Sequence, residues 1–389
     1  MKRSFAAACG VLFAVLAVGC GGGGTGKGDG SGGGRGGGST GPIRIGAVLE
    51  LSGSTATYGE ETQNGINMAL EKINADRERP IEVIYQDNNS GPTESASAVR
   101  QLIDVDKVTA IIGAVASTNT IAGATQAQIN KTPMITPGST NVEVTKIGDY
   151  ISRVCFIDSF QGPAIARFAA EELKKTKGYL VIDKSADYSV GLAESIRTTF
   201  ESLGGTIVGE TSFEARASDF SALITQVEQA QPDVIFIPAY YREVGLMLKQ
   251  ARGHWDGIPK LGGDGWDSPQ LLELGGAGVT GTYFATHFAP DDPSPKIQEF
   301  TKEYEAKFGK PPGSMSGLGY DAALVVADAI DRVEGELTKE KLRDAINATS
   351  NVDGVTGTIK LDENRNPVKD LVILEVTTGG FKFKKKYSP

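Results

Sequence analysis

At 389 residues the chain is longer than one ordinary domain and has room for two domains and a tail. Hydrophobic residues make up 40% and charged residues 22%, the balance of a globular protein with enough apolar material for two cores. The 39 basic and 48 acidic side chains leave a net charge of −9. This acidity argues against a nucleic-acid partner, because proteins that bind nucleic acid carry a basic stripe.

The N-terminal end has the pattern of an export signal. Two basic residues precede an apolar run over 5–18, which is too short to span a membrane and is typical of a signal peptide. The run ends in AVGC, residues 17–20, which resembles a lipobox. We therefore expect a lipoprotein signal peptide over 1–19 and lipidation of Cys20, with a secretory signal that is cut without lipidation as the alternative.

The segment that follows Cys20 has the composition of a flexible tether. Residues 21–41 contain 14 glycines and no apolar side chain, so this segment has nothing to bury. Together, residues 20–41 are expected to hold the folded body near a membrane through the lipid alone, because no later stretch reads as a transmembrane helix. The expected location is the periplasm or the outer face of the cytoplasmic membrane.

From residue 43 onward, apolar runs of strand type alternate with helical patterns. Strands are expected at 43–51, 81–87, 108–115 and 133–136, with helices at 58–75, at 93–105 and after residue 118. The alternation restarts near residue 158, with helices at 160–175, 188–203, 218–229 and 241–252 and strands at 178–183, 206–213, 233–239 and 258–263. Helices at 294–308, 320–333 and 339–348 and a strand pair, 355–361 with 371–377, close the chain. Two such units predict an α/β protein with two doubly wound open sheets.

The sequence has no recognisable catalytic or metal-binding motif. His254 and His287 stand at no motif spacing from a Ser, Cys or acid, and no His or Cys pair is spaced like zinc ligands. G-x-S-x-G at 37–41 lies in the tether, without the strand that a nucleophile elbow needs. G-x-G-x-x-G at 276–281 follows a helix and precedes a strand, whereas the dinucleotide fingerprint needs the opposite order. We therefore expect no catalytic residue, no metal and no cofactor.

Hydroxyl and aromatic side chains gather in the loops that follow the expected strands. These loops are 52–60, 115–120, 137–141, 183–191, 239–243 and 262–269. Each residue alone is explained by helix capping, turn formation or packing. However, ligands of doubly wound sheets bind outside the carboxyl ends of the strands, and all six loops belong to that edge. Their shared position favours a ligand site.

The residue types in these loops suit a free amino acid. Ser117 or Thr118, at an expected helix N-terminus, suits an α-carboxylate. An α-ammonium needs a carboxylate and a carbonyl, because a buried charge must be paired, and Asp264 and the Ser139 carbonyl are the candidates. Ring faces for an apolar side chain are offered by Tyr58, Tyr188, Tyr240 and Trp266.

Six segments, in their order and spacing, resemble the type I periplasmic solute-binding proteins of ABC transporters, above all the leucine/isoleucine/valine-binding branch. They are GAVLELSGSTATYGE, PMITPGSTNVEVT, RVCFIDSFQG, DFSALI, AYYREVGLMLKQAR and GGDGWDSP. The resemblance covers nearly the whole body and implies two lobes, joined by three crossovers, that close on a ligand as a hinge. Lobe 1 is expected to contain 42–157 and 288–356, and lobe 2 to contain 158–287 and 357–389.

The resemblance also implies roles for individual residues. The carboxylate contacts of the family fall on Ser117 and Thr140, and its ammonium contacts fall on the Ser139 carbonyl, the Thr140 hydroxyl and Asp264. Its aromatic wall falls on Tyr58, Tyr188 and Tyr240. The implied protein is a monomer that is not an enzyme and that delivers an aliphatic or branched-chain L-amino acid to the permease subunits of an ABC importer.

A sensor is the main alternative, since the same fold serves as the ligand-binding part of receptors. Such a protein would bind an amino acid, an amide or a small carboxylate and report to a separate receptor partner. An enzyme is the third class, and it lacks a nucleophile–base pair here. The sequence does not say which amino acid is bound, because it does not give the volume of the pocket.

Overall fold

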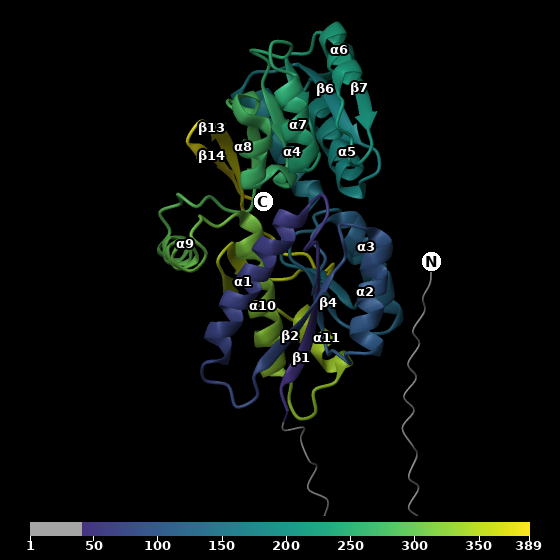
Figure 1. Ribbon diagram of the computed structural model, residues 1–389, viewed down its shortest axis with the longest axis vertical. Helices are drawn as coiled ribbons and strands as arrows, with labels where there is room; N and C mark the ends of the chain where they lie inside the picture. The colour runs from purple at the N-terminus through teal and green to yellow at the C-terminus, as the bar shows by residue number, and fades with distance from the viewer. Residues whose placement is uncertain (1–40) are drawn as a thin grey trace, which may run out of the picture. The chain divides into compact units, whose positions relative to one another are not determined.

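The computed structural model describes residues 41–389, and the statements below concern that part of the chain. It contains a five-stranded sheet and a seven-stranded sheet, each with its own helices (Figure 1). We call the part built on the five-stranded sheet lobe 1 and the part built on the seven-stranded sheet lobe 2. The predicted class, an α/β protein with two open sheets, is confirmed.

Lobe 1 is a parallel sheet with helices on both faces. Its strands are β1 (Ile43–Leu49), β2 (Ile81–Asp87), β3 (Ile111–Gly113), β4 (Met134–Thr136) and β5 (Ile151–Arg153), in the spatial order β2–β1–β3–β4–β5. On one face α1 (Ala56–Asn74) packs beside α10 (Ser314–Arg332), and on the other α2 (Pro92–Asp104) packs beside α3 (Ser117–Ile129) (Figure 1). The central strands β3 and β4 are buried along their length, as expected for a sheet covered on both sides.

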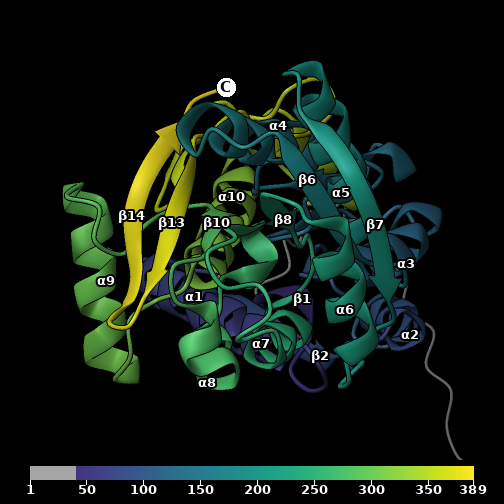
Figure 2. The same ribbon diagram turned by 90° about the horizontal axis from the view of Figure 1, so that it is seen from above.

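Lobe 2 is a mixed sheet in the order β14–β13–β10–β9–β8–β6–β7. Its strands are β6 (Lys177–Asp183), β7 (Thr206–Phe213), β8 (Val234–Phe236), β9 (Lys260–Gly262), β10 (Tyr283–Thr286), β13 (Leu371–Thr377) and β14 (Gly380–Tyr387). The strands from β6 to β10 are parallel, whereas β13 and β14 are antiparallel. The strands β14 and β7 form the two edges (Figure 2).

The remaining elements lie in the connections between the strands of the two sheets. They are η1 (Thr145–Ile147), α4 (Asp158–Arg167), η2 (Phe168–Glu172), α5 (Asp187–Ser202), α6 (Ser221–Ala230), α7 (Tyr241–Gln250), η3 (Asp264–Trp266), α8 (Pro269–Gly275), η4 (Gly276–Val279), α9 (Pro295–Phe308), α11 (Lys339–Asn347), β11 (Val352–Gly354) and β12 (Gly357–Ile359). Among the described residues, none of the helices is long and apolar enough to cross a membrane.

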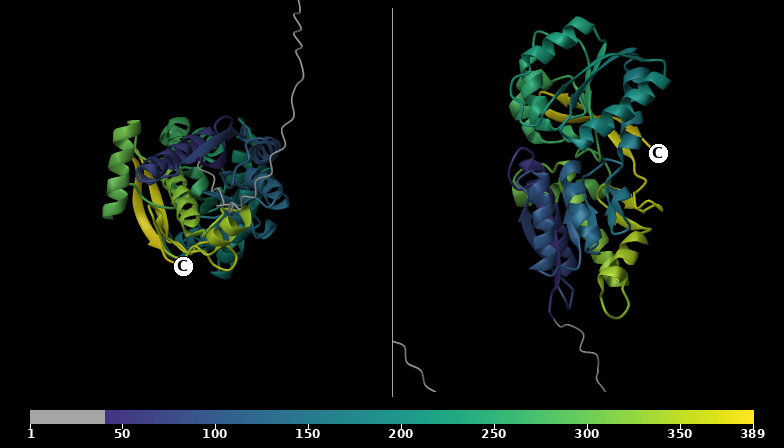
Figure 3. Two further views of the ribbon diagram at one scale, coloured as in Figure 1. Left: turned by 90° about the horizontal axis from the view of Figure 1, so that it is seen from below. Right: turned by 90° about the vertical axis from the view of Figure 1, so that its right-hand side faces the viewer.

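The chain passes between the lobes three times: after β5, between β10 and α10, and between β12 and β13 (Figure 3). These crossovers contact one another. The Lys369 ammonium in the third donates to the Val154 carbonyl in the first, at 3.1 Å. The His287 ring in the second stacks on the Phe156 ring in the first, with centroids 3.8 Å apart. The connection between the lobes is therefore a packed bundle of three segments.

One predicted strand pairing is wrong. The segment 355–361 does not pair with 371–377, because β12 pairs with β11 through a tight turn and β13 pairs with β10 and β14. Gly357, at φ +109°, permits that local turn, so the hairpin satisfies its own backbone. The edge strand β14 was not predicted, and its run of lysines explains why. Charges on an edge strand discourage pairing with other chains, but they also obscure the hydrophobic alternation by which a strand is predicted.

Candidate functional site

A cavity of about 210 Å³ lies between the lobes, at the carboxyl ends of the strands. Its lining comes from both lobes: Tyr58, Val115, Ser117, Gly138, Tyr188, Tyr240, Asp264, Gly265 and Met315. The structure thus brings together five of the predicted site residues, namely Tyr58, Ser117, Tyr188, Tyr240 and Asp264.

The lobe 1 side of the cavity is built on the start of α3. Ser117 is the first residue of this helix, and the N–H groups of a first helical turn have no partner within the helix. Its hydroxyl accepts a hydrogen bond from the Asn141 N–H at 3.4 Å, which ties the helix start to the neighbouring loop. Thr140 in that loop is fully buried, and its Oγ1 has no hydrogen-bond partner among residues 41–389. This side offers N–H and hydroxyl groups suited to an anion.

Glu50 fixes the loop just before α3 through hydrogen bonds, a role that the sequence did not suggest. Its buried carboxylate accepts hydrogen bonds from the N–H groups of Val115 and Ala116, both at 3.1 Å, and from the Asn119 side chain at 2.9 Å. Burial raises the pKa of Glu50, and these hydrogen bonds oppose the rise. The only signal in the sequence was an acid at the end of an apolar strand.

Three tyrosines form an aromatic wall that spans both lobes. Tyr188 and Tyr240 of lobe 2 stack with centroids 5.1 Å apart, and Tyr58 of lobe 1 meets Tyr240 edge-on at 6.0 Å. The Tyr58 hydroxyl donates to the Gly265 carbonyl, and the Tyr188 hydroxyl accepts from the Gly265 N–H at 3.0 Å. Since these hydroxyls are already bonded, the rings offer the cavity mainly apolar surface.

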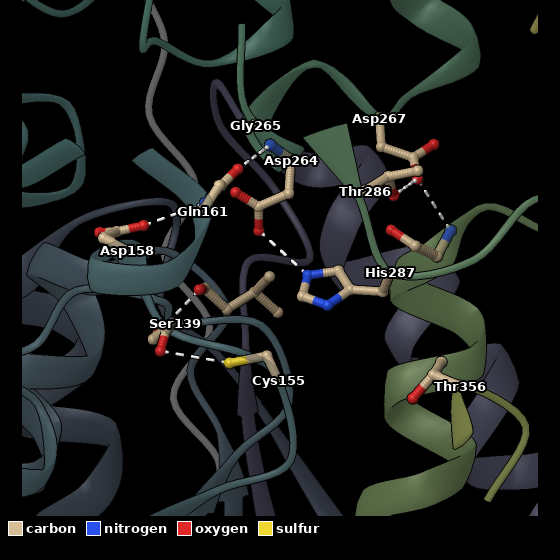
Figure 4. Close-up of polar contacts among 12 residues, drawn as sticks. Ser139, Cys155, Asp158, Gln161, Asp264, Gly265, Asp267, Thr286, His287 and Thr356 are labelled. Atoms are coloured by element: carbon tan, nitrogen blue, oxygen red, sulfur yellow. Dashed lines mark hydrogen bonds and ion pairs between the residues drawn. The ribbon is translucent and has the colours of Figure 1, made fainter. Parts of the chain in front are cut away.

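Asp264 lies on η3 between two glycines, as expected, and the structure explains why they are glycines. A Cβ on Gly263 would lie 2.4 Å from the Tyr188 hydroxyl, and one on Gly265 would lie 2.9 Å from the Tyr188 ring. The Asp264 N–H donates to Gln161 Oε1 at 2.7 Å, and its Oδ2 lies 3.2 Å from His287 Nε2 (Figure 4). Its other oxygen, Oδ1, is buried without a partner in the described part of the chain.

A second carboxyl group, that of Asp158, lies close to Asp264 and was not predicted. Burial, together with the charge of Asp264, raises the pKa of Asp158 to about 8, against the influence of the Thr140 hydroxyl and the Arg153 guanidinium. Its Oδ1 accepts from Gln161 Nε2 at 3.0 Å (Figure 4). Gln161 thus touches both acids. Asp158 begins the helix that enters lobe 2, so its place near the site follows from the crossover rather than from a strand end.

Ser139, a predicted site residue, does not line the cavity. Its carbonyl accepts from Arg153 Nη1 at 2.5 Å and from the Cys155 thiol at 3.3 Å, and its hydroxyl contacts Thr120 and the Val115 carbonyl. A guanidinium at this carbonyl disfavours a second cation there. Its neighbour Gly138 lines the cavity instead, and we correct the assignment accordingly.

Trp266 also lies away from the cavity. It is fully buried, and its indole N–H donates to the Ile237 carbonyl at 2.9 Å. A Cβ on Gly262 would lie 2.1 Å from the indole, so the ring packs directly on the backbone of β9. The short helix η3 turns Trp266 into the core of lobe 2 while Asp264, two residues earlier, meets the cavity. Cys20 lies outside the described residues.

Two cavity residues that the sequence did not single out are Gly138 and Met315. A Cβ on Gly138 would lie 2.9 Å from both Met315 Sδ and Val115 Cγ1, so only glycine leaves this part of the cavity open. Gly138 is within the quoted motif PGSTN, which offered a signal. Met315 is in the first turn of α10, five residues before the predicted start of that helix, and no motif pointed to its role.

Comparison with known proteins agrees with this geometry. The family model described as periplasmic binding protein matches residues 42–381. The leucine-specific-binding protein of Salmonella typhimurium is 28% identical over 326 residues, which cover 82% of this chain and 87% of that protein.

Two solved structures are also similar. A leucine-binding protein, LivK, from Thermotoga maritima has a TM-score of 0.85 and 38% identity, and the match covers 89% of this chain and 99% of that one. The branched-chain amino acid transporter substrate-binding protein LivJ from Streptococcus pneumoniae, in complex with isoleucine, has a TM-score of 0.84 and 32% identity over 90% of this chain and 100% of that one. The chain therefore belongs to the type I periplasmic binding proteins, in the leucine/isoleucine/valine-binding family of ABC-transporter solute-binding proteins.

Proposed function

We propose that this protein is the extracytoplasmic substrate-binding component of an ABC importer and not an enzyme. It binds a free aliphatic L-amino acid, of the leucine, isoleucine or valine type, in the cavity between the lobes and delivers it to a permease. The observation that carries the proposal is the pairing, within one small cavity, of the N-terminus of α3 at Ser117 with the partly unpaired carboxylate of Asp264.

The ligand's carboxylate lies, in this proposal, against Ser117 and Thr140. The start of α3 carries the positive end of the helix dipole, which favours an anion. The unpartnered hydroxyl of Thr140 adds a donor beside it. A buried hydroxyl without a partner costs free energy, and a bound carboxylate removes that cost.

The ligand's ammonium group binds, in this proposal, to Asp264 Oδ1, which has no partner among the described residues. Gly138, rather than Ser139, supplies the carbonyl acceptor, because Gly138 lines the cavity and the Ser139 carbonyl is bound to Arg153. A charge-assisted hydrogen bond to a buried carboxylate is among the stronger polar contacts in proteins. Asp264 would therefore carry most of the preference for an amine.

The side chain of the ligand packs, in this proposal, against the aromatic wall. Tyr58, Tyr188 and Tyr240 present ring surface, and Val115 and Met315 complete an apolar lining. The relatives described above include proteins named for leucine and for branched-chain amino acids, which also supports this class of ligand.

Ligand binding is expected to be coupled to closure of the two lobes. Their facing surfaces are joined by hydrogen bonds from Asn141 Nδ2 to the Asp187 carbonyl, at 2.7 Å, and from the Asp187 N–H to Thr118 Oγ1, at 3.0 Å. A ligand that contacts both lobes stabilises this closed arrangement. We take 42–157 with 288–356 and 158–287 with 357–389 as the two moving bodies, and the closed form as the one that the permease reads.

The membrane attachment is also part of the proposal. Family membership supports an extracytoplasmic location, where a signal peptide over 1–19 and a lipid on Cys20 would retain the protein at the membrane. Metabolic labelling with a radioactive fatty acid tests this directly. The wild-type protein should be labelled and a C20A variant should not.

The binding function is tested by isothermal titration calorimetry with a panel of L-amino acids. The protein is first unfolded and refolded, so that ligand carried through purification is removed. One or more aliphatic amino acids should bind, and D264N should weaken that binding about tenfold or more, the usual scale for a lost hydrogen bond to a charged group. Absence of binding by every amino acid would overturn the proposal. Loss of labelled amino-acid uptake in a strain lacking the protein separates an importer from a sensor.

A further inference from the structure

His287, which the sequence left without a role, contacts the acid at the centre of the proposed site. Its Nε2 lies 3.2 Å from Asp264 Oδ2, and the two side chains are only 1% and 3% exposed. The imidazole stacks on the Phe156 ring at 3.8 Å, with 21° between the ring planes. The ring is therefore held in a defined plane, with one nitrogen directed at the carboxylate (Figure 4).

The imidazole is neutral in this setting. Burial lowers the pKa of His287, and the positive Lys369 adds to this effect, whereas Asp264 and Asp267 oppose it. Its Nδ1 has no partner in the described structure, so the single proton belongs on Nε2, where it is donated to Asp264. A neutral donor holds a carboxylate without cancelling its charge.

Two buried acids lie close together here, and closely spaced carboxyl groups do not readily ionise together. Burial, together with the charge of Asp264, raises the pKa of Asp158 to about 8, so Asp158 retains a proton near neutral pH. Gln161 donates its side-chain N–H to Asp158 and accepts from the backbone of Asp264, whereas His287 donates to the Asp264 carboxylate alone. The hydrogen bond from His287 therefore favours the charge on Asp264 rather than on Asp158.

We propose that His287 is a positioning residue for the ligand's ammonium group: its Nε2–H holds Oδ2 of Asp264 and leaves Oδ1 directed at the cavity. This inference rests on the proposed function, since it needs an ammonium group at Asp264. It adds that part of the affinity for an amine is set by a residue in the second crossover, which does not itself touch the ligand.

Two variants distinguish the effect of the hydrogen-bond donor from the effect of the stacked ring. H287Q keeps an N–H donor near the position of Nε2 but loses the stacked ring. H287F keeps a flat ring on Phe156 but has no donor, and H287L takes its place if H287F does not fold. Thermal unfolding first checks that each variant is folded, and the dissociation constant for L-leucine, or for the amino acid that the wild type binds best, is then measured calorimetrically at pH 7.

The charged groups that act on His287 are Asp264, Asp267 and Lys369. Affinity of H287F should fall about tenfold or more at pH 7, because Oδ2 of Asp264 loses its hydrogen-bond donor and the carboxylate is no longer held with Oδ1 towards the ligand. H287Q, which keeps a donor, should stay within a few-fold of wild type.

Two results would overturn the inference. They are an H287F affinity equal to that of wild type, or an H287Q variant as weak as H287F. The second result would mark a packing role for the ring. If the wild type binds no amino acid, the proposed function fails and the inference fails with it. If the wild type binds and the variants bind equally well, only the inference fails.

Discussion

The main-chain carbonyl of Ser139 accepts a hydrogen bond from the guanidinium of Arg153, with 2.5 Å between the oxygen and Nη1. Arg153 is fully buried, and its Nη2 donates to the Asn141 carbonyl at 2.8 Å. One side chain at the end of β5 thus fixes two carbonyls of the loop 137–141 on the side away from the cavity. This leaves Gly138 to line the cavity and explains why Ser139 does not.

Replacing Arg153 by Met is expected to destabilise the protein and to weaken ligand binding. The free energy of unfolding should fall by about 3 kcal/mol or more, because two buried carbonyls lose their donor and each unsatisfied group costs about 1–3 kcal/mol. Urea denaturation measures this change. The control is K146M, since Lys146 pairs with Glu143 on the exposed surface, and its loss should cost no more than about 0.5 kcal/mol.

Ser139 and Ser117 should behave differently when each is changed to Ala. S139A loses buried hydrogen bonds to Thr120 and the Val115 carbonyl, so its free energy of unfolding should fall by about 1–3 kcal/mol while amino-acid affinity stays within about twofold. S117A should keep more of the stability but lose about tenfold in affinity, the scale of one hydrogen bond to a charged group. Calorimetric titration and urea denaturation of both variants provide the comparison. A larger affinity loss in S139A would return Ser139 to the site.

Trp266→Phe tests the assignment of Trp266 to the core. The change removes the hydrogen bond to the Ile237 carbonyl and part of a fully buried ring, so we expect a loss of about 1–3 kcal/mol in the free energy of unfolding and little change in affinity. Tyr240→Leu is the matched variant in the aromatic wall and should mainly reduce affinity. If W266F binds ligand as poorly as Y240L, Trp266 belongs to the site after all.

Asp158 should give the ligand-free protein a distinctive pH dependence. Its pKa is about 8 in the folded protein and about 3.9 in an unfolded chain, so between these values the folded state holds a proton that the unfolded state has lost. The resulting contribution to stability is complete below about pH 4 and is lost as the pH rises through about 8. Chemical denaturation at several pH values should show stability falling over this window in wild type and a flatter profile in D158N. An equal slope in both proteins would contradict the assignment.

The parts of the site that could be predicted are those that follow from strand ends. Tyr58, Ser117, Tyr188, Tyr240 and Asp264 all stand in loops after strands or in the first turn of the next helix, and a doubly wound sheet brings these loops to one edge. The class of fold followed in the same way from alternating apolar runs and helical patterns. Both predictions depend on local sequence and a general rule of topology.

The parts that could not be predicted depend on contacts between distant residues. Whether Gly138 or Ser139 meets the cavity is decided by Arg153, which approaches the loop from a strand that was itself not predicted. His287 was set aside because it stands at no motif spacing from a Ser, Cys or acid, yet it contacts Asp264, 23 positions earlier. Trp266 shares a loop with Asp264 but points into the core, because a 3₁₀ turn separates their directions.

The contact between Asp264 and the ligand's ammonium group is tested most directly by changing the ligand rather than the protein. L-leucine, 4-methylpentanoic acid, which lacks the ammonium group, and leucinamide, which lacks the carboxylate, are titrated against the refolded protein and D264N. We expect each analogue to bind wild type at least about tenfold more weakly than leucine, and the difference between leucine and 4-methylpentanoic acid to shrink in D264N, because its basis is the ammonium–Asp264 contact. Equal binding of leucine and 4-methylpentanoic acid by the wild-type protein would contradict the account.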